Sequence, residues 1–92
     1  MSEFDLLASQ WEDAYRAYTA AEDANRYAGA VDPEKVARLA VSCREVASVW
    51  RNLAALPKTD WWAKAAALHA ADMFEHHAAA TETRTLGWQE GR

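Results

Sequence analysis

The stretch from Asp32 to Pro57, DPEKVARLAVSCREVASVWRNLAALP, decides the fold of this chain. Asp32 is a preferred helix N-cap residue, and Pro33 suits the first helical position, where its missing N–H removes no hydrogen bond. Leu56 precedes a proline, which disfavours the α conformation, so the helix is expected to end there. Between these limits the apolar residues recur at alternating steps of three and four: Val36, Leu39, Cys43, Val46, Trp50 and Leu53. This heptad spacing predicts a helix with one apolar seam, which Ala40, Ala47 and Ala54 widen.

A second seam precedes this helix. Ser2 and Asp5 form an approximate capping box, in which each side chain bonds the backbone N–H of the other residue. Gly29 can supply a C-terminal cap, because glycine readily adopts the left-handed conformation. The seam positions between them are Phe4, Leu7, Trp11, Ala14, Tyr18, Ala21, Asn25 and Ala28. The pattern therefore predicts a first helix that begins at Ser2 and ends at Gly29.

A third, alanine-rich helix is expected after Pro57, capped by Thr59 or Asp60 and ending near Thr83 or Thr85. Its apolar face is less clearly marked than the other two. We place Trp62 at the centre of the inward side, together with Ala65, Ala66, His69, Met73, His76 and Ala80. Residues 86–92 are expected to form a short C-terminal tail that carries Trp88.

The connections between the three helices are short, which favours antiparallel neighbours. We predict an all-α fold, an antiparallel up-down-up three-helix bundle with coiled-coil-like heptad seams, in one domain over residues 1–85. The chain has 92 residues, so its core is small, and many seam residues are alanines that bury little area. Dimerisation is one way in which such a core can be completed.

The composition excludes several classes of protein. The net charge of −4 disfavours a stand-alone nucleic-acid-binding protein, and the single Cys43 leaves no second cysteine for a disulfide within the chain. No apolar run reaches the length of a membrane span, and the acidic N-terminus does not resemble a signal peptide. We expect a cytoplasmic protein without a cofactor. Its use of Ala, Arg and Trp is typical of GC-rich bacterial coding.

Five tryptophans in so short a chain are more than three thin helices are expected to enclose. We predict that another chain, either a second copy or a partner protein, covers part of this aromatic surface. The expected function is a non-enzymatic helical protein–protein interaction module, acting as a homo-oligomer or as a small subunit or adaptor. The predicted contact residues are Trp61, Trp62, Phe74 and Trp88. Tyr15, Tyr27, Val41 and Val49 are further candidates for outward positions.

A second hypothesis starts from Arg44, Arg51 and Lys58, which are spaced seven residues apart and form a basic stripe beside the seam. Such a stripe can contact a nucleic-acid backbone once the chain has oligomerised. The alternative is a solvated face that steers helix pairing, and the negative net charge favours it.

A third hypothesis is a metal-binding bundle. His69, Asp72 and His76 follow at spacings that bring them onto one side of a helix, and imidazole with carboxylate suits Zn, Fe or Mn. The segment lacks the His-Glu-x-x-His and Glu-x-x-His templates, so a second chain would have to complete the site.

An enzyme is the class with the least support. Cys43 lies on an apolar seam, where a cysteine behaves as a small hydrophobic residue rather than as a nucleophile. Gly29 lies far from Gly87 and Gly91, so the three glycines cannot together build a phosphate-binding loop.

Overall fold

The computed structural model describes residues 2–26 and 32–90, with side chains as far as residue 83. Three helices make up this part of the chain: α1 (Glu3–Arg26), α2 (Pro33–Ala54) and α3 (Trp61–Glu90). The prediction of an all-α fold of three packed helices is confirmed. The expectations for Tyr27, Ala28 and Gly29, and for the side chain of Trp88, lie outside the described residues.

The predicted helix starts are confirmed in detail. The Asp5 backbone N–H donates to Ser2 Oγ at 3.1 Å, and the Ser2 N–H donates to Asp5 Oδ2 at 3.4 Å, which is the reciprocal capping box. Asp32 has an extended backbone, and its carboxylate accepts from the backbone N–H groups of Glu34 and Lys35. These bonds satisfy donors that the first turn of each helix would otherwise leave unpaired.

Helix α3 begins as expected at the Asp60 cap but ends later than predicted. The carbonyl oxygen of Asp60 accepts from the Lys64 N–H at 2.9 Å, so Asp60 rather than Thr59 occupies the cap position. The helix then continues to Glu90, through Gly87 and most of the expected tail. One glycine within a helix costs only about 1 kcal/mol relative to alanine, which is too little to stop it here.

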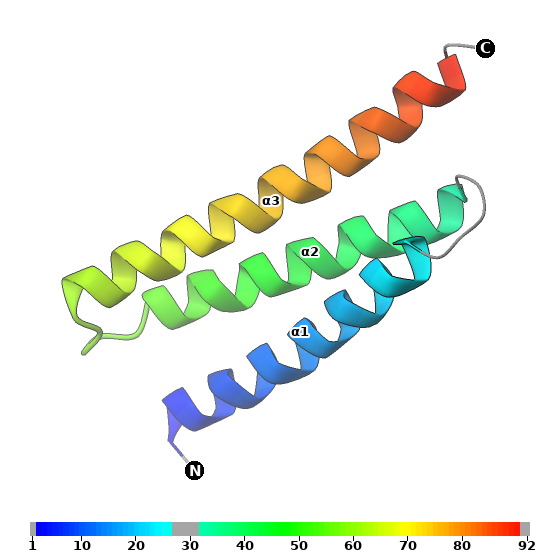
Figure 1. Cartoon of the computed structure of the whole chain (residues 1–92). Coiled ribbons are helices and arrows are strands. Elements are labelled where there is room, and N and C mark those ends of the chain that lie inside the picture. The colour runs from blue at the N-terminus through cyan, green and yellow to red at the C-terminus, as the bar shows by residue number, and fades with distance from the viewer. Residues whose placement is uncertain (1, 27–31, 91–92) are drawn as a thin grey trace.

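Helix α2 lies between the other two helices and packs against both of them (Figure 1). The Cα trace measures 51 × 22 × 13 Å along its principal axes, so the molecule is elongated and flat. In the described part of the chain, no Cα atom of α1 comes within 8 Å of one in α3. The two outer helices therefore meet through their side chains only. The up-down-up order and coiled-coil packing stay predictions.

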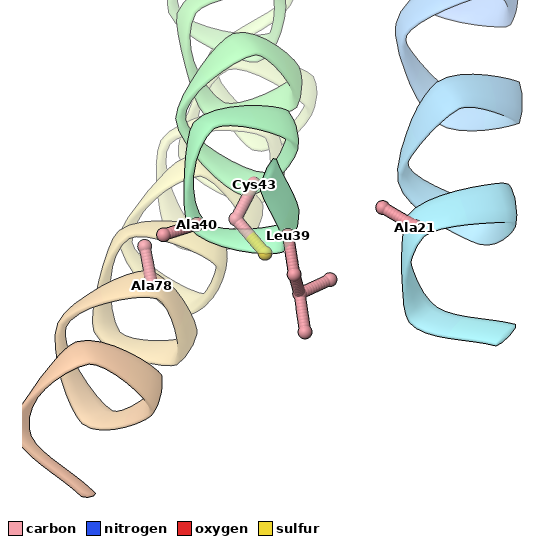
Figure 2. Packing of buried hydrophobic residues seen from close by; sticks show 5 residues of the cluster. All are labelled: Ala21, Leu39, Ala40, Cys43 and Ala78. Atoms are coloured by element: carbon pink, nitrogen blue, oxygen red, sulfur yellow. The ribbon is translucent and has the colours of Figure 1, made fainter. Parts of the chain in front are cut away.

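The core consists mostly of small side chains. Among the residues described, the largest fully buried side chains are those of Val46 and Cys43. Figure 2 shows Ala40 of α2 beside Ala78 of α3, while Ala21 points from α1 toward Leu39 and Cys43. Small residues let two helix backbones approach closely, but each buries little apolar area. Burial of this core consequently stabilises the fold less than burial of Leu and Ile would in helices of the same length.

The predicted seam of α2 is confirmed. Its buried residues are Val36, Leu39, Ala40, Ser42, Cys43, Val46, Ala47 and Ala54, and the seam residues Trp50 and Leu53 are half-buried. The seam of α1 is confirmed in part. Phe4 is 60% exposed, the members from Leu7 to Tyr18 are half-buried, and Ala21 is buried. Helix α1 thus lies at the edge of the fold and buries less of its apolar surface than α2.

The predicted inward face of α3 is wrong. Ala65, Ala66, His69, Met73, His76 and Ala80 are exposed, and Trp62 is 62% exposed. The inward face is formed instead by Ala67, Ala71, Ala78 and Thr81, with Phe74 half-buried beside them. The helix is apolar on more than one side, so the pattern could not tell which stripe packs on α2. The stripe with the smaller side chains does so, because it permits the closer approach.

No helix in the described residues combines the length and the apolar character that crossing a membrane requires.

Candidate functional site

Three aromatic rings follow one another along the inner side of α1. Trp11 and Tyr15 stack with centroids 4.9 Å apart and ring planes 17° apart. The Tyr15 and Tyr18 centroids are separated by 5.7 Å. The three residues are four and three positions apart, so they share one face of the helix. Helix α1 therefore presents a continuous row of rings to the rest of the molecule.

Rings from α2 and α3 extend this row. Trp50 of α2 meets Trp11 edge to face at 5.5 Å, and Phe74 of α3 meets Tyr18 edge to face at 5.1 Å. Phe74 also lies 6.5 Å from Tyr15, and His77 lies 6.3 Å from Tyr18. Such pairs contribute about 0.5–1.5 kcal/mol each beyond the area they bury. We call these six residues the aromatic ladder: Trp11, Tyr15, Tyr18, Trp50, Phe74 and His77.

The aromatic ladder provides side-chain contacts between α1 and α3, whose backbones lie too far apart to pack directly. Sequence reasoning missed it, although the spacing of Trp11, Tyr15 and Tyr18 pointed to a shared face. The sequence pattern does not define the register between α1 and α3, and this register brings Phe74 and His77 opposite Tyr18. Phe74 had been expected to contact a partner, but it is half-buried within the ladder. Phe74 thus takes part in the chain's own packing, and its contact with a partner stays a prediction.

A polar cluster lies at one end of the aromatic ladder. The Tyr18 hydroxyl donates to Glu22 Oε2 at 2.5 Å, and Arg26 Nη2 donates to Glu22 Oε1 at 2.9 Å. Burial, and then the hydrogen bond to Glu22, raise the pKa of Tyr18 well above its ordinary value. The phenol serves as a hydrogen-bond donor to Glu22 in this cluster.

Cys43 is fully buried on α2. Burial raises the pKa of its thiol to about 11, and the negative charge of Glu22 adds to the shift. Because the thiolate is the reactive form of cysteine, the position is inert in the folded chain. This agrees with the prediction of a packing role.

We expect Cys43 to react with a thiol-specific disulfide reagent at pH 8 at least about 100-fold more slowly in the native chain than in urea. The reason is twofold, since the raised pKa removes the thiolate and burial blocks the reagent. The measurement is the rate of release of the coloured thiol product. A native rate within tenfold of the unfolded rate would contradict the buried placement.

Ion pairs link α2 to α3 on the outer surface. Arg51 Nε donates to Glu75 Oε1 at 2.9 Å, and its Nη2 donates to Asp72 Oδ1 at 2.8 Å. Arg51 lowers the pKa of Glu75 through this hydrogen bond, and the two carboxylates raise the pKa of Arg51. Arg44 forms an ion pair with Glu82, although the contact lacks hydrogen-bond geometry. These groups are partly exposed, so they contribute more to helix register than to stability.

The ion pairs bear directly on the basic stripe of Arg44, Arg51 and Lys58. Two of its three cations are engaged with carboxylates of α3. The helix pairing to which these two cations contribute is that of α2 with α3. A nucleic-acid backbone would have to compete with Asp72, Glu75 and Glu82 for these guanidinium groups.

The histidine segment of α3 does not form a gathered donor set. His69 is exposed, and the ring Nδ1 of His76 lies 3.1 Å from the backbone oxygen of Asp72. The Asp72 carboxylate is paired with Arg51. Over residues 2–26 and 32–83, no three His, Cys, Asp or Glu side chains come close enough together to hold a metal ion. A metal site at His69, Asp72 and His76 would need ligands from another chain.

An apolar hollow of about 340 Å³ lies where the start of α1, the end of α2 and the start of α3 meet. Trp11 and Trp50 line it, and the indole Nε1 atom of each is buried without a hydrogen-bond partner. The two rings meet edge to face across the hollow. The remaining lining is Phe4, Ala8, Glu12, Leu53, Leu56, Thr59, Ala63 and Ala67.

The two most exposed large apolar side chains among the described residues are those of Trp61 and Trp62 on α3, and Met73 of the same helix is also exposed. Trp61 is 82% exposed, Trp62 is 62% exposed and Met73 is 59% exposed. Trp62 and Met73 belong to the stripe that had been expected to face inward. We call this stripe, which faces away from α2, the outer stripe: Trp62, Ala66, His69, Met73, His76 and Ala80. Two of the predicted contact residues, Trp61 and Trp62, thus lie on the surface.

Comparisons with models of known protein families, with curated proteins and with solved structures gave no match.

Proposed function

We propose that the chain is a non-enzymatic helical protein–protein interaction module, acting as a homo-oligomer or as a small subunit or adaptor of a larger complex. The observation that carries the proposal is the apolar surface of α3, where Trp61, Trp62 and Met73 are each more than half exposed. Monomeric proteins rarely expose large apolar patches, and three large exposed apolar side chains on one helix support a binding surface there. Tryptophan is also enriched among the residues that dominate binding energy at interfaces.

The shape of the molecule supports the same proposal. Over residues 2–26 and 32–90, the backbones of α1 and α3 do not come within 8 Å of each other at their Cα atoms, and the core is built largely from alanine. The start of α1, the end of α2 and the start of α3 line one hollow, which is the arrangement that up-down-up order produces. We infer this order for the fold, with association adding apolar burial that the monomer lacks.

No specific observation favours the other two hypotheses. Arg44 and Arg51 are held by carboxylates of α3, which reduces the positive charge available to a nucleic acid. Asp72 is held by Arg51, which removes a carboxylate from the candidate metal ligands. Burial raises the pKa values of both Tyr18 and Cys43, which favours packing roles for these two side chains.

We expect replacement of Trp61 and Trp62 together by Ala to weaken association at least tenfold while the free energy of unfolding changes by less than about 1 kcal/mol. The reason is that both indoles are mostly exposed, so folding gains little from them. Sedimentation equilibrium measures the first quantity, and urea unfolding at low protein concentration measures the second.

Trp50→Ala is the matched control, because Trp50 is half-buried in the aromatic ladder and its loss should destabilise the fold. An equal loss of stability in the Trp61 and Trp62 variant would show that these rings serve folding, and the proposed function would then fail.

A further inference from the structure

The outer stripe of α3 has the spacing of a helix-pairing seam. Its members alternate at steps of four and three, from Trp62 to Ala80, and each of them is exposed. Such a heptad repeat keeps a seam facing a second helix along its whole length. The seam extends for about 27 Å at 1.5 Å per residue. Helix α2 occupies the other side of α3, and among the described residues no Cα atom of α1 comes within 8 Å of one in α3, so no helix in this part of the chain packs on the seam.

The order of large and small residues makes the outer stripe complementary to itself in one orientation. In an antiparallel pair centred between His69 and Met73, Trp62 faces Ala80 of the partner subunit. In the same register, Ala66 faces His76 of the partner subunit. A two-fold axis repeats each contact in reverse, as an isologous interface requires. Trp62 and His76 therefore each meet an alanine, while Met73 meets His69 of the partner subunit, so the largest side chain of the stripe faces one of the smallest.

Parallel pairing lacks this complementarity. In a parallel pair in register, Trp62 would face the partner's Trp62, and Ala66 would face the partner's Ala66. Layers of two large side chains would then be followed by layers of two small ones. Parallel pairing would also juxtapose His69 with the partner's His69. The antiparallel register is consequently the one that the residues support.

The charges beside the outer stripe are compatible with a second copy. The neighbouring positions are mostly uncharged, and Asp72 is the carboxylate that would lie beside its own copy at the two-fold axis. Its charge is paired with Arg51 at 2.8 Å. In the dimer, each Asp72 carboxylate is accompanied by the Arg51 guanidinium group of its own copy. These positive groups offset the repulsion between the two carboxylates. Glu75 is held by the same arginine and brings no unpaired charge.

The area available indicates a weak complex. A standard interface buries about 800 Å² per partner, and one helix face of this length supplies roughly half of that. A hollow formed by Tyr18, Met73, Phe74 and His77 adjoins the outer stripe at Met73 and adds contact surface. A Kd on the order of 10–100 µM suits an interface at this small end of the range.

We propose that the outer stripe of α3 pairs with the same stripe of a second copy, antiparallel, in the register that places Trp62 against Ala80 of the partner subunit. The proposal rests on the interaction function above and names its partner. It requires no ligand, and its two halves are related by symmetry.

Cysteine cross-linking tests the register. Ala66→Cys and His76→Cys are made separately, and each is oxidised alone and in an equal mixture at about 200 µM. We expect a disulfide-linked dimer in the mixture, because residue 66 of one copy faces residue 76 of the other. Each variant alone should give little, since its two cysteines would lie about 15 Å apart along the helix axis. The unaltered chain is the control, because its Cys43 is fully buried.

A second test, which does not depend on oxidation, exchanges the large and the small side chain at positions 62 and 80. Trp62→Ala and Ala80→Trp should each weaken dimerisation at least tenfold, the first by loss of contact and the second by a clash between indoles. The double variant restores one large and one small residue at each layer, and it should recover most of the wild-type affinity. Circular dichroism checks that all three variants are folded.

The outcomes separate this proposal from the broader function. A dimer that cross-links 66 to 66 or 76 to 76, or one that the double variant does not restore, overturns the register and leaves self-association intact. A monomer at 500 µM overturns pairing with a second copy. The proposal of an interaction module is tested separately, by the effect of replacing Trp61 and Trp62 on the free energy of unfolding.

Discussion

Replacing Val46 by Asp is expected to destabilise the fold by about 4 kcal/mol or more, a large part of the stability of a domain of this size. Val46 is 0% exposed at the centre of α2, and an aspartate there would have to be buried without a partner or remain protonated. The expected fall in Tm is about 15–30 °C. Thermal unfolding followed by circular dichroism measures it.

Val41→Asp is the matched control, because it makes the same substitution in the same helix at a side chain that is 53% exposed. Valine and aspartate have similar helix propensities, so the change in stability should stay within about 0.5 kcal/mol. Equal effects at the two positions would mean that α2 does not bury the face on which the fold depends.

Replacing Ala71 by Leu is expected to cost about 1–3 kcal/mol through overpacking. Ala71 is 0% exposed on the inward face of α3, where small side chains allow the close approach to α2. A leucine would have to push the two helices apart or adopt a strained rotamer. Urea unfolding in dilute solution measures the change in the free energy of unfolding.

Ala79→Leu is the corresponding control, because Ala79 is exposed about two turns further along α3. This substitution should leave the free energy of unfolding nearly unchanged. This pair of variants also tests which side of α3 faces inward. Were Ala71→Leu tolerated as well as Ala79→Leu, the inward face assigned to Ala67, Ala71 and Ala78 would be wrong.

The aromatic ladder explains how a three-helix layer stays together when its outer helices lack backbone contact. The edge-to-face contact of Tyr18 with Phe74 is the main bridge between α1 and α3, and Trp11 joins α1 to α2 through Trp50. Because these contacts are side-chain contacts at the edge of the fold, α1 holds its place with less buried surface than α2. The same openness leaves the outer stripe of α3 available for another chain.

Local sequence signals were sufficient where the relevant interactions are local. Asp32 with Pro33, and Ser2 with Asp5, predicted the helix starts, since a cap depends on residues within one turn. The seam of α2 was predictable because Val36 to Val46 stand out from the polar residues around them. The number of helices and the all-α class followed from the same signals.

The sequence by itself therefore determined three capped helices, the buried seam of α2 and an excess of aromatic surface. Only the tertiary structure decided which stripe of α3 packs on α2, because Ala67, Ala71 and Ala78 look no more apolar in sequence than Trp62 and Met73. It also decided that Arg51 pairs with Asp72 and Glu75, and that Phe74 belongs to the chain's own packing. Closeness of approach selects between two apolar stripes, and this is a property of two helices together that neither helix pattern contains.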